Sequence, residues 1–241
     1  APSCVWPPER ASARSGQAVQ RIRSGIPFSP IFNNCSGKHA GMLMYAVHRG
    51  YPIDDYVSRD SRVQQDMWQA VSDVAGLPRE EVALGVDGCG VVVFGMPLSS
   101  MARAYARMSA PESLPAEYVE PARRITRVMT EHPEMVGGAG EFGSNLMAGA
   151  RGALFCKGGA EGLFCVGIPG KGLGVAVKIE DGGARALPST IMEILRVLGV
   201  GTPEMAGMNE LAIERPVRNC RGDVVGYMRP CFELEKASGT I

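Results

Sequence analysis

The sequence predicts an α+β fold in which an antiparallel sheet is flanked by helices. Helical patterns with an apolar face fill most of the first 131 residues, and short strands joined by tight, glycine-containing turns follow them. A further helical pattern comes after these strands. Helices, then hairpins, then a closing helix are typical of an α+β fold and not of regularly alternating parallel strands and helices.

The predicted helices end at residues that commonly stop a helix. A glycine follows each of the first three, and glycine readily adopts the left-handed backbone found at helix ends. The predicted helices span residues 9–24, 35–49, 61–75, 98–108, 116–131 and 190–198.

Short runs rich in β-branched residues predict the strands. The connections 87–90, 158–159 and 169–172 are short and rich in glycine, which favours hairpins between antiparallel neighbours. The predicted strands span residues 82–86, 91–94, 153–156, 162–168, 173–179 and 224–228.

The composition excludes several classes of protein. The 241 residues carry 25 basic and 25 acidic side chains, so the sequence predicts no nucleic-acid partner and no membrane partner. No apolar run approaches the roughly 18 to 20 residues that span a bilayer. Seven irregularly spaced cysteines fit a reducing compartment better than a disulfide framework. We therefore expect a cytoplasmic protein that folds as a single domain over residues 1–241.

The chain opens Ala1-Pro2-Ser3-Cys4, without an initiator methionine. We therefore expect it to begin inside a longer reading frame or after processing. On this interpretation the domain is N-terminally incomplete, and part of any active site lies upstream.

The segment 33–43 concentrates reactive groups at the predicted start of a helix. Cys35, Lys38 and His39 share one face, because residues three and four apart are neighbours on a helix. The partial positive charge of a helix N-terminus favours a thiolate. This pattern indicates a reactive or metal-binding corner, and the alternative is a buried cysteine beside a chance Lys-His pair.

A second thiol, Cys89, lies in the glycine-rich turn 87–90 between two predicted strands. Together with Cys35 and one nitrogen it would form a soft three-ligand zinc site with a fourth position for water. Neutral imidazole is the usual nitrogen ligand, which favours His39, whereas Lys38 can serve only as a neutral amine. The spacing leaves both nitrogens open. Taken alone, the turn is an ordinary hairpin connection with a small buried residue.

Lys157 stands at the end of a predicted strand and is followed by two glycines. In some acyl-transfer enzymes a Lys-Ser/Thr-Gly strand lines the active site and supplies charge and backbone donors. Gly158 takes the place of the hydroxyl residue here, so the match is partial and an ordinary hairpin is the alternative.

Several stretches of the sequence carry a family resemblance. They are NNCSGKHAGML, GVDGCG, HPEMV followed by a glycine-rich loop, and KGGAEGLFC with GKGLGVAVKIEDG, in this order. Together they resemble the bacterial L-asparaginase II family of the rhizobial inducible type, from about Cys4 to residues 225–226. The resemblance implies a fold like that of serine β-lactamases and class A glutaminases, a homodimer, and hydrolysis of L-asparagine to L-aspartate and ammonia.

The resemblance also implies roles for individual residues. It implies a zinc ion held by Cys35, Lys38 and Cys89, and so favours Lys38 over His39 as the nitrogen ligand. Cys165 corresponds to a cysteine near the active site of the family. We therefore expect this set of residues in the site: Lys157 as a catalytic residue, and Asn34, Ser36 and Cys165 as contacts of the substrate.

The chain departs from the family pattern in two places. The nucleophile of the family is a serine in a Ser-x-x-Lys pair, which these 241 residues lack, so we expect it upstream. The family commonly has Gly-Thr-Gly-Arg-Phe-Asp-Thr where residues 138–144 read GAGEFGS. A truncated or diverged non-catalytic relative is therefore the alternative. A cysteine hydrolase using Cys35 with His39 is a weaker one, since no orienting Asp or Asn is identifiable.

Overall fold

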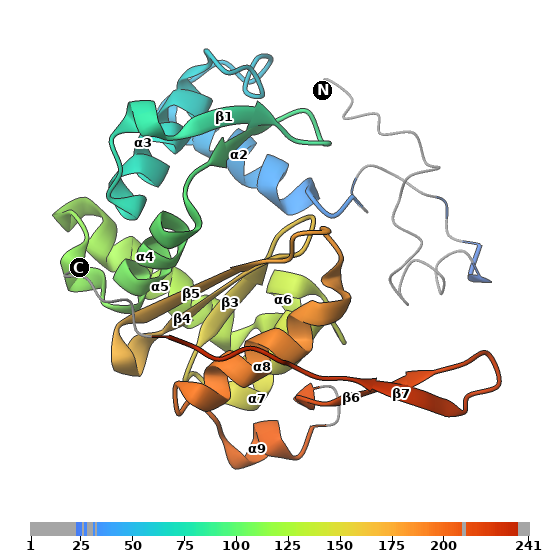
Figure 1. Ribbon diagram of the computed structural model, residues 1–241. Helices are drawn as coiled ribbons and strands as arrows, with labels where there is room; N and C mark the ends of the chain where they lie inside the picture. Colours follow the sequence, from blue (N-terminus) through green and yellow to red (C-terminus); the bar gives the residue numbers. More distant parts are fainter. Residues whose placement is uncertain (1–22, 26, 28–30, 32, 209–210, 236–241) are drawn as a thin grey trace. The chain divides into compact units, whose positions relative to one another are not determined.

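The computed structural model describes residues 23–25, 27, 31, 33–208 and 211–235 (Figure 1). Contacts divide the chain into two compact units. Unit 1 comprises Ala1–Ser72 and Pro78–Met96, and unit 2 comprises Asp73–Leu77 and Pro97–Ile241. The helix predicted over residues 9–24 lies almost wholly outside the described residues.

The described residues of unit 1 include two longer α-helices and a two-stranded antiparallel sheet. Gly50 ends the first helix in the left-handed conformation, at φ 66°, as its position in the sequence predicts. The elements are α2 (Ser36–Arg49), α3 (Arg62–Ala75, whose last residues belong to unit 2), β1 (Ala83–Val86) and β2 (Val92–Gly95).

Helices α2 and α3 are joined by a small core and by a shared carboxylate. Ala46, Tyr56 and Val63 are buried at the centre of this core. At its edge the hydroxyls of Tyr45 and Tyr51 both donate to Asp66 Oδ2, over 2.7 and 2.9 Å. Burial and the bonded carboxylate raise the pKa of Tyr45 to about 12, so this hydroxyl keeps its proton.

Unit 2 is built on a three-stranded antiparallel sheet with the order β3-β4-β5. The tight turns at Gly159–Gly162 and at Pro169–Gly172 set this meander, which confirms the predicted arrangement. In Figure 1 the sheet runs through the middle of the unit, with helices around it. The strands are β3 (Phe155–Gly158), β4 (Leu163–Ile168) and β5 (Leu173–Lys178).

The helices of unit 2 surround this sheet. They are α4 (Leu98–Ser109), α5 (Ala116–Glu131), α6 (Pro133–Gly137), α7 (Phe142–Ala150), α8 (Leu187–Val197) and α9 (Pro203–Ala206). The described residues also include these short 3-10 turns: η3 (Arg79–Glu81), η4 (Pro111–Ser113), η5 (Pro169–Lys171) and η6 (Ala184–Ala186).

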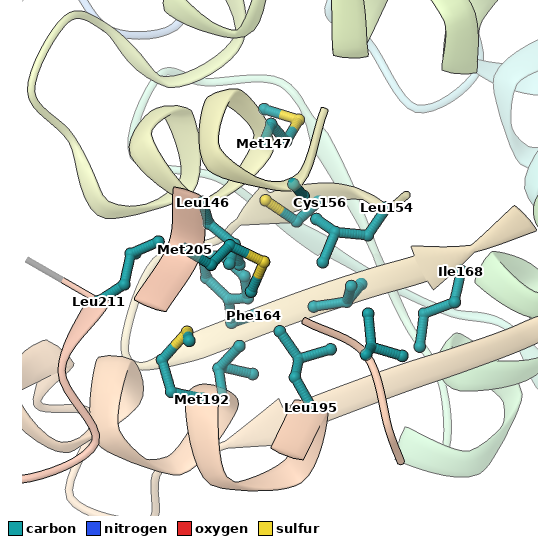
Figure 2. Close-up of a cluster of buried hydrophobic side chains, with 14 of the residues drawn as sticks. Leu146, Met147, Leu154, Cys156, Phe164, Ile168, Met192, Leu195, Met205 and Leu211 are labelled. Carbon is teal, nitrogen blue, oxygen red and sulfur yellow. The ribbon is translucent and has the colours of Figure 1, made fainter. Parts of the chain in front are cut away.

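The main core lies between the sheet, α7 and α8 (Figure 2). Its side chains are almost all fully buried aliphatic, Met and Phe residues, which pack as in other protein interiors. The members drawn and labelled in Figure 2 are Leu146, Met147, Leu154, Cys156, Phe164, Ile168, Met192, Leu195, Met205 and Leu211.

A separate hairpin of β6 (Arg215–Arg218) and β7 (Val224–Met228) completes unit 2, and Figure 1 shows it extending from the rest of the unit. The prediction of β7 is confirmed over the same residues, whereas the sequence analysis missed β6. Pro216 and two arginines obscure the strand pattern of β6. Proline is tolerated in edge strands, and both strands of a two-stranded ribbon have one free edge.

The structure confirms the α+β class, with small antiparallel sheets flanked by helices. It also adds a helix, α7, where a glycine-rich loop is expected after residue 132. Strand β3 is displaced by two residues from its predicted span, and helix α8 begins three residues and ends one residue earlier than predicted. Within the described part of the chain, no helix is long and apolar enough to cross a membrane.

Close approach of α4 to the sheet depends on a glycine. Gly174 of β5 lies opposite Gly167 of β4, and a Cβ at Gly174 would overlap the backbone of Ala102 and Ala106 in α4. Backbone atoms cannot move aside as a flexible side chain can, so the helix itself would have to shift.

We expect Gly174→Ala to lower the free energy of unfolding by at least about 2 kcal/mol, because it overpacks this contact. The matched control is Gly226→Ala in β7, where a Cβ would meet no atom within 4 Å. Urea denaturation followed by circular dichroism measures both. Equal stability of the two variants would contradict the close contact.

Candidate metal centre

The first of the candidate donors, Cys35, stands at the start of α2 as its N-cap residue. Asn33 holds the approach to the helix, because its side-chain oxygen accepts the Cys35 N–H over 2.8 Å and its carbonyl accepts the Ser36 N–H over 3.0 Å. The Cys35 carbonyl in turn accepts the His39 N–H over 3.0 Å, the first bond of the helix. The sequence prediction that the helix starts at this cysteine is confirmed to within one residue.

The second donor group lies in the turn between β1 and β2. The Gly90 N–H donates to the Asp87 carbonyl over 2.9 Å, and the Asp87 N–H donates to Val91 over 2.8 Å. Gly90 has a φ of 84°, which glycine adopts without the strain that another residue would meet. This closes a three-residue hairpin loop of a common kind and fixes Asp87 and Cys89 on the turn.

The two donor groups meet within unit 1. The Cys35 Sγ, the Cys89 Sγ and a carboxylate oxygen of Asp87 each lie within 4.8 Å of the other two. The Cys89 thiol lies 3.6 Å from Asp87 Oδ2 as a hydrogen-bond donor, and Lys38 Nζ donates to the same oxygen over 2.8 Å. The structure thus brings Cys35, Lys38 and Cys89 together around Asp87.

Asp87 is the residue that sequence reasoning missed as a donor. Its position two residues before Cys89 was the available signal, since a tight turn presents such neighbours together. Asp-Gly at a hairpin is, however, equally typical of a purely structural turn. Here the carboxylate has a structural role and also belongs to the donor set. Its Oδ1 accepts the Gly88 N–H over 2.7 Å, while Oδ2 bonds the Cys89 thiol and Lys38.

Burial and the neighbouring groups set the charges at this site. Burial raises the pKa of Cys35, as do its hydrogen bond to Cys89 and the acidic groups nearby, and Lys38 opposes them only in part. The hydrogen bond from Lys38 holds the pKa of Asp87 below its usual value. Burial acts to lower the pKa of Lys38, but the bond to Asp87 and the surrounding negative groups outweigh it and raise this pKa. Without a metal, Lys38 and Asp87 therefore form an ammonium–carboxylate pair beside the protonated Cys35 thiol.

This donor set suits zinc. Two thiolates with one nitrogen or carboxylate oxygen are typical zinc ligands, and a bound dication favours the deprotonated form of each. The third donor has two candidates: Asp87 is already anionic, whereas Lys38 must first release a proton. The soft sulfurs disfavour calcium and magnesium, which prefer oxygen ligands.

His39 turns away from this set of donors. Its Nδ1 hydrogen-bonds the Tyr56 hydroxyl over 2.7 Å, and the side chain is only 7% exposed. Its Nε2 is buried and has no hydrogen-bond partner among the described residues, so neither ring nitrogen bonds Cys35. The Cys35–His39 pair that a cysteine hydrolase requires is therefore not formed in this structure.

The remaining predicted site residues lie in both units. Asn34 is exposed and Ser36 is half-buried, on either side of Cys35. In unit 2, Lys157 of β3 pairs in register with Cys165 of β4. The exposed Lys157 ammonium donates to the Gly158 carbonyl over 2.6 Å, and burial raises the pKa of Cys165 to about 11. Cys165 is thus a protonated thiol on the strand next to the one that carries Lys157.

The glycine-rich segment 138–144 leads into α7 in the same unit. Gly138 and Gly140 have φ values of 98° and 81°, so both take conformations that favour glycine. Ser144 is buried, and its hydroxyl donates to the Pro133 carbonyl over 2.9 Å, which ties the start of α7 to α6. Glu141 is exposed at the position where the family pattern has arginine.

We expect protonation of His39 to destabilise the protein, because burial and the neighbouring Lys38 lower the pKa of this imidazole in the folded chain. The unfolded chain then binds the proton more readily, so stability is complete above about pH 6.5 and falls as the pH decreases below it. Urea denaturation midpoints measured across this range should fall with decreasing pH in the parent. In His39→Gln this fall should be smaller. The midpoints of His48→Gln, which replaces an exposed histidine of the same helix, should show the same dependence on pH as those of the parent.

Comparison with known proteins places the chain in a family. No curated protein matches the chain. The family model described as L-asparaginase II matches residues 4–230, which include both donor segments and the strands of unit 2. A match over nearly the whole chain agrees with the order of the motifs along the sequence. The chain belongs to the L-asparaginase II family.

Proposed function

We propose that the protein is an amidohydrolase that converts L-asparagine to L-aspartate and ammonia, with a zinc ion organising its site. Membership of the L-asparaginase II family supports the reaction. The observation that carries the metal is the convergence of Cys35, Cys89 and Asp87 within 4.8 Å, with Lys38 bonded to Asp87. Zinc there would supply positive charge that orients and polarises a bound group.

The residues of this chain have separate tasks in the proposal. Cys35 and Cys89 hold the metal, and the Lys38–Asp87 pair supplies the third protein donor. Asn34 and Ser36 stand beside Cys35 and contact the substrate. In unit 2 the Lys157 ammonium stabilises developing negative charge, with Cys165 as its neighbour.

The nucleophile belongs to a Ser-x-x-Lys pair upstream of Ala1, in this proposal. The serine oxygen attacks the side-chain amide carbon, its proton passes through the paired lysine to the amide nitrogen, and the C–N bond breaks to release ammonia. Water then attacks the resulting ester, which releases L-aspartate and restores the serine hydroxyl. In this proposal the protein acts as a homodimer, as the family resemblance implies, and in the cytoplasm, as its irregularly spaced cysteines indicate.

A second candidate is a non-catalytic relative that keeps the fold and the metal site. The segment 138–144 favours it, because Ala139 and Glu141 stand where the family pattern has threonine and arginine. The change removes one hydroxyl and reverses one charge. A carboxylate there would repel the carboxylate of an amino-acid substrate.

We expect the purified protein to bind one Zn²⁺ per chain, and Cys35→Ser or Cys89→Ser to weaken this binding by more than about 100-fold. Loss of an outer partner of a metal site already costs about 10- to 100-fold, and these residues are proposed as direct ligands. Competition with a chromophoric chelator measures the affinity.

The matched control is Cys220→Ser, which removes an exposed thiol of unit 2 and should leave zinc binding unchanged. Lys38→Met and Asp87→Asn compare the two candidates for the third donor, since the true ligand causes the larger loss. Zinc affinity that is the same in both cysteine variants and the parent would remove the metal from the proposal.

We expect a version of the chain that is extended upstream to include the Ser-x-x-Lys pair to release ammonia from L-asparagine. Replacing that serine by alanine should abolish the release, because no acyl-enzyme forms. A coupled ammonia assay measures both. An extended protein that binds zinc but releases no ammonia would support the non-catalytic relative, and gain of activity in Ala139→Thr/Glu141→Arg would assign the loss to segment 138–144.

A further inference from the structure

We propose that Tyr56 is a positioning residue for the metal donors of α2. Through the hydrogen bond of its hydroxyl to His39, it fixes the first turn of the helix and so places Cys35 and Lys38 opposite the β1–β2 turn. The inference rests on the proposed metal site and adds to it a residue outside both donor segments.

The first turn of α2 has little stability of its own. Cys35 is the N-cap but makes no side-chain capping bond, and the first turn contains no acidic residue to complement the helix dipole. Gly37 and Gly41 fall in the first two turns, and each costs about 1 kcal/mol relative to alanine in a helix. The turn that carries Cys35 and Lys38 therefore needs support from outside the helix.

His39 is the side chain through which this support reaches the first turn. It is buried, its N–H bonds the Cys35 carbonyl over 3.0 Å, and it directly follows Lys38. Its Nδ1 bonds the Tyr56 hydroxyl over 2.7 Å, and the two rings meet edge to face with centroids 5.7 Å apart. A shift of the Tyr56 hydroxyl is thus transmitted through His39 to Cys35 and Lys38.

Tyr56 is itself held firmly by the start of α3. Its carbonyl oxygen accepts hydrogen bonds from Gln64 Nε2 over 2.9 Å and from the Ser61 hydroxyl over 3.2 Å. Gln64 is 1% exposed and Tyr56 is 6% exposed, so both bonds are shielded from water. The start of α3 is therefore the fixed point, and Tyr56 links it to the start of α2.

The same pair of helices contains a matched control. Tyr45 also joins α2 to α3 by a hydroxyl bond, 2.7 Å to Asp66, but it lies in the second half of α2. Tyr45→Phe and Tyr56→Phe each remove one phenolic oxygen: the first bonds α2 to Asp66 of α3, and the second bonds α2 to the segment just before α3. Only Tyr56 bonds the turn that carries the metal donors.

The test uses the full chain and Zn²⁺ alone, with affinity measured by competition with a chromophoric chelator. We expect Tyr56→Phe to weaken binding about 10-fold, at the lower end of the loss caused by removing an outer contact of a metal site. We expect Tyr45→Phe to change it less than about twofold. Replacement by Co²⁺ gives a second readout, because its absorption spectrum reports ligand geometry and should change in Tyr56→Phe alone.

A thermodynamic cycle with His39→Leu tests whether Tyr56 acts through the histidine. If it does, the double variant loses no more zinc affinity than whichever single variant has the larger loss. Losses that multiply in the double variant, or equal affinities of Tyr56→Phe and Tyr45→Phe, would overturn the inference. The proposed metal site fails separately, and only if Cys35→Ser and Cys89→Ser keep the zinc affinity of the parent.

Discussion

The site depends on one constraint, which is that sulfurs from two elements far apart in the sequence must be held at one place. The turn that carries Cys89 is rigid because its own backbone bonds and Gly90 close it. The turn that carries Cys35 is less firmly held, since the N-cap residue of α2 makes no side-chain capping bond. The Lys38–Asp87 ion pair at 2.8 Å joins the two, but both side chains are about one-third exposed and such pairs contribute little energy. The contact of His39 with Tyr56, just before α3, therefore adds to the order at this end of α2.

Much of the fold could be predicted from the sequence because local signals and tertiary packing agree. Gly50 and Gly76 adopt the left-handed conformation where the stop signals place them. The meander β3-β4-β5 follows from short β-branched runs separated by tight turns. In the site, the sequence predicts that a thiol at a helix start and a thiol on a hairpin turn meet. The structure places the Cys35 and Cys89 sulfur atoms within 4.8 Å of each other. The single-domain organisation and the likeness to serine β-lactamases remain predictions.

The remaining features depend on packing that local patterns do not encode. Helix α7 contains Gly143 and Gly149, which lower helix propensity, yet each allows close packing: Cys156 and Phe164 at the first, and two methionines at the second. Asp87 looks like a turn residue in the sequence, and only the approach of α2 makes it the centre of the donor set. The choice between Lys38 and His39 is open in the sequence for the same reason, because Tyr56 engages the histidine from a distant segment.

The distribution of thiols has a practical consequence for chemical labelling. Cys156 and Cys165 are buried in unit 2, where burial raises their pKa values to about 12 and about 11, so alkylating reagents will find little thiolate there. Cys220 and Cys231 are exposed and open to such reagents. With those two replaced by serine, the half-buried Cys35 and Cys89 become the thiols of the described chain best placed for a fluorophore or a spin probe. Protection of this pair from alkylation by added metal would then give a readout of occupancy that needs no turnover.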